Sequence, residues 1–227
     1  MSALQDQADG LRRLMAKTPD RLIAVLGSGP SAGASSVTRN LAAALSQCGQ
    51  RVLLLDQHAY RFEASGEGRF TLLDAGLDNR QAQADLIASA DCVLVVLEPN
   101  PASITNAYAR IKKLQYTGAA QKLFVMVNRA GERGAATRIL LNLAYTCEHY
   151  LQLDVGLAGV VSNDGRVSQA ERLNTTAVEA YPDTTVAQDF LAIAALLVKA
   201  LQSAAIALPT LPALSSAAPV SRQPLAA

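Results

Sequence analysis

The sequence predicts an α/β fold in three layers, with a mostly parallel sheet between two layers of helices. Short apolar segments rich in β-forming residues recur along the chain between turn signals, at residues 21–27, 51–56, 69–74, 92–97, 122–128 and 157–161. Stretches of helical period separate them. These strand segments are nearly unbroken apolar runs, which is typical of parallel strands covered on both faces.

The chain divides into three parts by composition. Residues 1–18 form a charged head in which Leu4, Ala8, Leu11 and Met15 give one apolar stripe at helical spacing. Residues 19–202 form the α/β domain. Residues 203–227 form a tail rich in Ala, Pro and Ser, whose prolines interrupt any continuous helix, so we expect it to be disordered.

Two helices of the domain can be placed from pattern. Ile104, Ala107, Ile111 and Leu114 recur on one face, and Ser103 before them is a candidate N-cap. Residues 185–202 are apolar on much of their surface and carry one lysine, Lys199. We expect this last helix to pack on the sheet, because its weak basicity argues against recruitment to lipid.

Composition excludes several classes of function. The 227 residues carry 20 basic and 19 acidic side chains, a net charge of +1, so no nucleic-acid footprint is indicated. Three scattered cysteines and two histidines give no metal-ligand spacing, and we expect buried free thiols. The first residues lack the order of a secretory signal, and we expect a cytoplasmic protein.

The turn after the first strand is rich in glycine and serine and opens a helix. A phosphate-binding loop belongs at this place, because helix N-terminal N–H groups favour an anion. Against the pattern G-x-x-x-x-G-K-[ST], Gly33 and Ser35 match, whereas Ser28 and Ala34 do not. The next two strands end at Asp56 and Asp74, where a nucleotide site would hold magnesium.

Four segments carry a resemblance to a known family. They read QDQADGLRRLM at 5–15, LEPNPASITNAYARIKKL at 97–114, VMVNRA at 125–130, and the strand and loop at 156–188. Together they resemble the MinD/ParA ATPases of the P-loop NTPase type, and the DQAxxLR element at 6–12 resembles the flagellar-number regulators FlhG and FleN. The resemblance implies a nucleotide site made of Gly33, Ser35, Ser36, Asp56, Asp74 and Asn128, in which the asparagine contacts adenine.

The departures from the family pattern fall on that site. Gly29 and Ala34 replace its two lysines, Pro30 has no N–H, and His58 replaces its second aspartate. The block that the family places between Asp56 and Asp74 is shortened to a linker. The loss of two lysines removes about 3–6 kcal/mol of binding free energy, which weakens the affinity for nucleotide about a hundred- to ten-thousand-fold. We therefore expect no enzyme and no cofactor, with Mg-ATP bound weakly at most and the remaining site residues vestigial or, for Asn128, serving only to tie down a loop.

The resemblance assigns the head a partner, an SRP-type flagellar GTPase like FlhF, contacted by Asp6, Gln7, Ala8, Leu11 and Arg12. From the residues alone, the apolar stripe needs a groove, on the protein's own body or on a partner. The expected protein is a monomeric regulator of flagellar number or placement, recruited to the pole or inner membrane by partners. Two alternatives stay open: a slow ATPase that uses Arg39, and an accessory protein of another polar or envelope machine, such as secretion or cellulose export.

Overall fold

The computed structural model describes residues 21–55, 60–63, 68–75, 87–118 and 122–202. The predicted head and tail lie outside these residues, and so do Asp56 and His58. The structure therefore does not test the predictions that Asp6, Gln7, Ala8, Leu11 and Arg12 bind a partner.

Seven strands form one sheet in the order β3-β2-β4-β1-β5-β6-β7. Six of them run parallel, which confirms the predicted mostly parallel sheet. Their bounds are β1 (Arg21–Gly27), β2 (Gln50–Leu55), β4 (Gly68–Asp74), β5 (Cys92–Leu97), β6 (Leu123–Ala130) and β7 (Gly156–Ser162). The central β5 is buried at every position, as the unbroken apolar run indicated.

The seventh strand, β3 (Tyr60–Glu63), was not predicted. It pairs antiparallel with β2 at the edge of the sheet, inside the segment interpreted as a bare linker. Its sequence, YRFE, alternates polar and apolar residues over one short run, and that pattern is too brief to identify a strand. An antiparallel edge strand on a parallel sheet is common in folds of this type.

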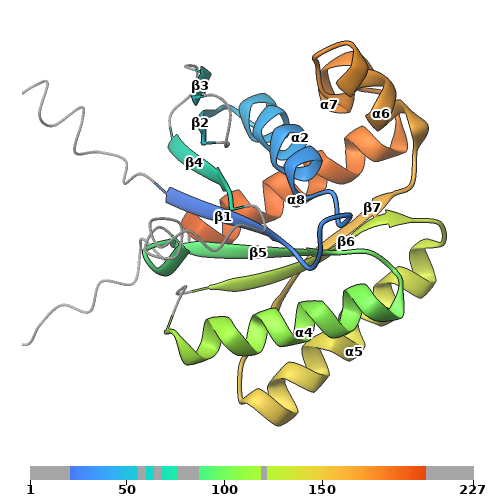
Figure 1. Ribbon diagram of the computed structural model, residues 1–227. Coiled ribbons are helices and arrows are strands. Elements are labelled where there is room, and N and C mark those ends of the chain that lie inside the picture. Colours follow the sequence, from blue (N-terminus) through green and yellow to red (C-terminus); the bar gives the residue numbers. More distant parts are fainter. Residues whose placement is uncertain (1–20, 56–59, 64–67, 76–86, 119–121, 203–227) are drawn as a thin grey trace, which may run out of the picture.

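Two helical layers cover the sheet (Figure 1). Helices α2 (Ala34–Gln47) and α8 (Thr185–Gln202) share one core with the sheet, and α4 (Pro101–Tyr116) and α5 (Arg133–Leu151) share the core on its other face. The short helices α6 (Gly165–Arg172) and α7 (Ala177–Ala180) connect β7 to α8. Since the parallel strands share one direction, their carboxyl ends and the loops into the helices meet at one edge of the sheet.

The cap of α4 differs from the prediction. Asn100, not Ser103, is the N-cap, and its side-chain oxygen accepts a hydrogen bond from the Ser103 N–H at 2.8 Å. Pro101 occupies the first helical position, where its missing N–H costs nothing. Ser103 is thereby left inside the first turn, with its hydroxyl directed to the loop after β1.

Helix α8 packs on the sheet as expected. Its buried residues recur at helical spacing and include Val186, Phe190, Ile193 and Leu197. It is the one helix among the described residues that is long and apolar enough to cross a bilayer. Burial of this face in the core against α2 and β7 accounts for that apolarity.

The cysteines are free thiols, as predicted, and Cys92 and Cys147 are buried whereas Cys48 is half-buried. Burial raises the pKa of Cys92 to about 12 and that of Cys147 to about 11. These thiols stay protonated at neutral pH. The described residues contain no group of three or more side chains arranged to hold a metal ion.

Candidate functional site

The loop from β1 to α2 starts at a buried serine. The Ser28 N–H donates to the carbonyl of Val96 in β5 at 2.8 Å, and the Ser28 hydroxyl lies 2.6 Å from that of Ser103. The Ser103 hydroxyl also accepts from the Glu98 N–H at 2.8 Å. These bonds fasten the start of the loop to the end of β5.

The next residues form a tight turn. The Ala32 N–H donates to the Gly29 carbonyl at 3.2 Å, which closes a turn across Pro30 and Ser31. Pro30 has no N–H to offer. Two amides of the loop are thus unavailable to an anion, where a phosphate-binding loop relies on several converging N–H groups.

Gly33 ends the loop in a left-handed backbone conformation, which favours glycine. Its φ is 76°, and a Cβ built there would lie 2.7 Å from Nδ2 of Asn128. It serves as N-cap of α2, which begins at Ala34 with no side-chain cap and no acidic residue in its first turn. Ser35 is exposed and Ser36 is half-buried in that turn.

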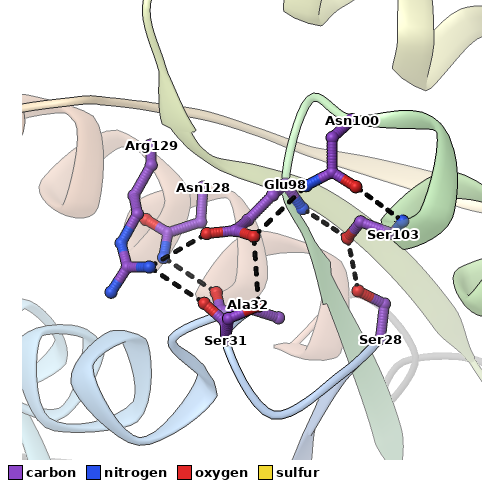
Figure 2. A network of polar contacts seen from close by, with 8 residues as sticks. All are labelled: Ser28, Ser31, Ala32, Glu98, Asn100, Ser103, Asn128 and Arg129. Atoms are coloured by element: carbon purple, nitrogen blue, oxygen red, sulfur yellow. Dashed lines mark hydrogen bonds and ion pairs between the residues drawn. The ribbon is translucent and has the colours of Figure 1, made fainter.

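Two side chains from the end of β6 bind the carbonyls of the loop (Figure 2). Nδ2 of Asn128 donates to the Ala32 carbonyl at 3.0 Å, and Nη1 of Arg129 donates to the Ser31 carbonyl at 2.9 Å. Asn128 is buried, and Arg129 adopts a left-handed backbone conformation with φ 55°. The residue to which the resemblance assigns adenine contact therefore bonds to the loop.

Glu98 completes the cluster. Its carboxylate accepts from Nη1 of Arg129 at 2.9 Å, and its other oxygen lies 3.4 Å from the Ser31 hydroxyl and 3.3 Å from the Asn100 amide. The side chains are 51% exposed for Arg129 and 17% for Glu98. The Glu98 carboxylate beside the loop would repel a polyphosphate. It also neutralises Arg129, the one cationic side chain seen to contact the loop among the described residues.

Sheet topology brings the predicted site residues to one edge. Gly33, Ser35 and Ser36 lie at the start of α2, Asn128 lies near the end of β6, and buried Asp74 ends β4 opposite Val25 of β1. Sequence reasoning missed Ser28, Glu98, Ser103 and Arg129. Glu98 directly follows β5, and Arg129 lies at the end of β6. A position at the carboxyl end of an apolar strand is the sequence signal that could have placed both residues at this edge of the sheet.

A second polar cluster lies further along this edge. Asp189 of α8 accepts from the Ser162 N–H at 2.9 Å, the Ser162 hydroxyl at 2.7 Å and Nη1 of Arg133 at 2.6 Å. Its side chain is only 4% exposed. The carboxylate joins the end of β7 to the start of α5 and to α8.

The fold is that of the MinD/ParA ATPases. The chain superimposes with a TM-score of 0.61 on MinD of Pyrococcus horikoshii OT3 complexed with Mg-ADP, at 18% identity over 80% of this chain and 97% of that one. It superimposes with a TM-score of 0.58 on a ParA family ATPase of Chlorobium tepidum TLS, at 12% identity over 78% of this chain and 98% of that one. The predicted resemblance is confirmed at the level of the fold.

Sequence comparison points to the flagellar branch. The chain is 23% identical to the antiactivator FleN of Pseudomonas aeruginosa, over an alignment that covers 81% of this chain and 88% of FleN. No family model matches the chain. The chain is thus MinD/ParA-like and distantly similar to a regulator of the FleN type.

Proposed function

We propose that this protein is a non-enzymatic, MinD-like regulator of flagellar number or placement, which binds and stimulates an SRP-type flagellar GTPase. Its head, through Asp6, Gln7, Ala8, Leu11 and Arg12, contacts that GTPase. The protein acts as a cytoplasmic monomer that partners recruit to the flagellated pole or inner membrane. It requires no cofactor and binds Mg-ATP weakly at most.

The observation that carries the proposal is the state of the loop after β1. Its lysines are absent, two of its amides cannot reach an anion, and its carbonyls at Ser31 and Ala32 bind Arg129 and Asn128. In a nucleotide switch, the bound phosphates would organise this loop. Here Asn128 and Arg129 bind the loop carbonyls, and a loop held by the protein's own side chains favours regulation through partners.

The similarity to FleN, an antiactivator by name, supports action on other proteins. The DQAxxLR element at 6–12 supports the head as the contact. An amphipathic helix of this length binds through its stripe in a groove, and Arg12 and Arg13 add charge-assisted contacts.

Titration of the intact chain with a magnesium-ATP analogue by calorimetry tests the first half of the proposal. We expect no saturable heat up to about 1 mM nucleotide, since two lost lysines weaken binding at least about a hundredfold. Binding in the micromolar range would refute the decayed site.

The second half is tested by the GTP turnover of an SRP-type flagellar GTPase. We expect the intact chain to accelerate it, Gln7→Ala to abolish the effect, and Gln5→Ala, which changes the same residue type outside the motif, to leave it intact. If the intact chain leaves the rate of GTP turnover unchanged, the proposed stimulation of the GTPase is wrong, whatever the result of the nucleotide titration.

A second candidate function, an ATP-binding switch or slow ATPase, rests on the position of Arg129. A Cβ on Gly33 would lie 3.5 Å from Nη2 of Arg129, so this guanidinium is close to the start of α2. Arg39, the cation considered from sequence, is exposed on the second turn of α2. If Arg129 served nucleotide, Arg129→Ala would weaken an observed affinity at least about tenfold.

A further inference from the structure

The loop from β1 to α2 presents oxygen atoms to the end of β6. The carbonyl oxygen of Ser31 and a carboxylate oxygen of Glu98 each lie 2.9 Å from Nη1 of Arg129. The Ala32 carbonyl accepts from Nδ2 of Asn128 at 3.0 Å. A phosphate-binding loop has the opposite polarity, because its N–H groups converge on negative charge. The oxygen atoms found here are the partners that a cation needs.

The guanidinium of Arg129 lies against both the loop and Glu98 (Figure 2). A guanidinium is planar and carries its N–H donors in a fixed fork, which suits several oxygen acceptors at once. Nη1 serves both oxygens, while Nη2 lies 3.5 Å from a Cβ position built on Gly33. The charged group therefore lies beside the N-terminus of α2, where a nucleotide site holds phosphate.

The end of β6 is shaped to bring this side chain to the loop. Arg129 has a φ of 55°, a left-handed conformation that residues other than glycine rarely adopt. The register of β6 against β7 also shifts between Val127 and Ala130, an irregularity of the β-bulge type. A bulge re-aims a side chain, and an unfavourable backbone persists where the surrounding contacts hold it. Both features fall on the residue whose side chain binds the loop.

A cation at this place needs an anion beside it. The N-terminus of a helix carries a partial positive charge, which repels a guanidinium. Helix α2 has neither a side-chain cap nor an acidic residue in its first turn to offset that repulsion. Glu98, whose side chain is 17% exposed, supplies the negative charge, and its second oxygen lies 3.4 Å from the Ser31 hydroxyl. The carbonyl and the carboxylate together can accept one guanidinium.

We propose that the loop after β1 is a guanidinium-binding site and that Arg129 is its built-in ligand. The Ser31 carbonyl and the Glu98 carboxylate bind the cation, and the bond from Asn128 to Ala32 holds the loop in the shape that receives it. A cation of the chain itself thus takes the part that a phosphate plays in a nucleotide switch. The inference deepens the proposed function and rests on it, since it requires a loop that binds no phosphate.

The test is chemical rescue in the full-length chain, with the loop followed by amide hydrogen exchange and mass spectrometry. Arg129→Ala should raise the exchange rate of residues 31–34 about tenfold, the effect of one lost charge-assisted bond. Guanidinium chloride should return the rate toward that of the unchanged chain, half-way at about 10–50 mM, because a tethered group acts at a millimolar effective concentration. Such concentrations are far below the molar range in which guanidinium unfolds proteins.

The controls separate shape, charge and position. Urea has a similar planar shape without the charge, and ammonium has the charge without the fork, so neither should slow exchange at equal concentration. In Glu98→Gln/Arg129→Ala, guanidinium should bind at least about tenfold more weakly, because the negative charge of its site is gone. Arg138→Ala, which removes an exposed arginine from α5, should leave the exchange of the loop unchanged.

Glu98→Gln keeps Arg129 in place and tests the same contact should Arg129→Ala not fold; its loop amides should exchange about threefold faster. Unchanged exchange in both single variants overturns the proposal, as does an Arg129→Ala loop that guanidinium does not protect. Equal protection by urea or ammonium overturns it too, and so does protection by inorganic pyrophosphate, which identifies an anion site. Neither ATP nor the GTPase enters the measurement, so a failed rescue by guanidinium is distinct from a failure of the proposed function.

Discussion

Two carboxylates at the carboxyl edge of the sheet each bind an arginine from the β6–α5 region, yet their surroundings differ. Asp189 is 4% exposed and accepts from the backbone and side chain of Ser162 as well as from Arg133. Glu98 is 17% exposed and pairs with an Arg129 that is half in solvent. The first cluster joins α8, α5 and β7, whereas the second joins only the loop after β1 to the ends of β5 and β6.

The difference shows which polar contacts stabilise the fold and which shape a surface. A buried carboxylate that accepts a backbone N–H leaves that N–H unsatisfied when it is removed, at a full desolvation cost. A half-exposed ion pair exchanges for water at little cost. We therefore expect the Asp189 cluster to control global stability and the Glu98 cluster to control only the conformation of the loop.

Asp189→Ala should have the largest effect. We expect the free energy of unfolding to fall by about 3 kcal/mol, because Ser162 loses two bonds to a charged acceptor in the core. Urea denaturation followed by circular dichroism measures it. Asp189→Asn, which retains an acceptor oxygen, should recover about half of the loss. A cost below that of Glu98→Ala would reverse the comparison.

Gly33→Ala comes next. The left-handed backbone costs a non-glycine residue about 1–2 kcal/mol. The new methyl group would also collide with Asn128, because a Cβ built on Gly33 lies 2.7 Å from Nδ2 of that side chain. Thermal unfolding should register the loss. Gly29→Ala is the matched control, since a Cβ there meets nothing within 4 Å. Equal melting temperatures for the two variants would show that the loop has no fixed conformation.

Arg129→Ala should change global stability by less than about 1 kcal/mol, as expected of a half-exposed ion pair. The amides of Ser31 to Ala34 should nevertheless exchange hydrogen faster, because the Ser31 carbonyl loses its donor. Hydrogen exchange with mass spectrometry separates the two effects. Glu98→Gln should give a smaller rise in exchange, since the amide oxygen still accepts from Arg129. Slower exchange in either variant would contradict the role assigned to the pair.

Ser35→Ala should have the smallest effect. In a working site this residue would serve magnesium, but here it is exposed in the first turn of α2. We expect a change in unfolding free energy within about 0.5 kcal/mol and no change in stimulation of the GTPase. A lost stimulation would mean that nucleotide or magnesium acts through this loop.

Much of the fold was predictable because its strands are buried on both faces. The bounds of β1 and β5 agree with the predicted ranges, since their apolar runs stop at glycine or at charged and polar residues. The β3 strand was not predicted, because a short edge strand needs no apolar run. The cap at Asn100 was missed because Ser103 is an equally good capping residue by type.

By itself, the sequence determined that the loop after β1 has lost its lysines, because side-chain identity at a motif is a local property. It also determined the parallel α/β class through the spacing of its apolar runs. Only the tertiary structure decided what now binds the loop. Arg129 reaches Ser31 across 98 positions of the chain and Glu98 reaches it across 67. Parallel pairing of β1, β5 and β6 brings these residues to one edge, and pairing between distant segments leaves no signal in the local pattern of any of them.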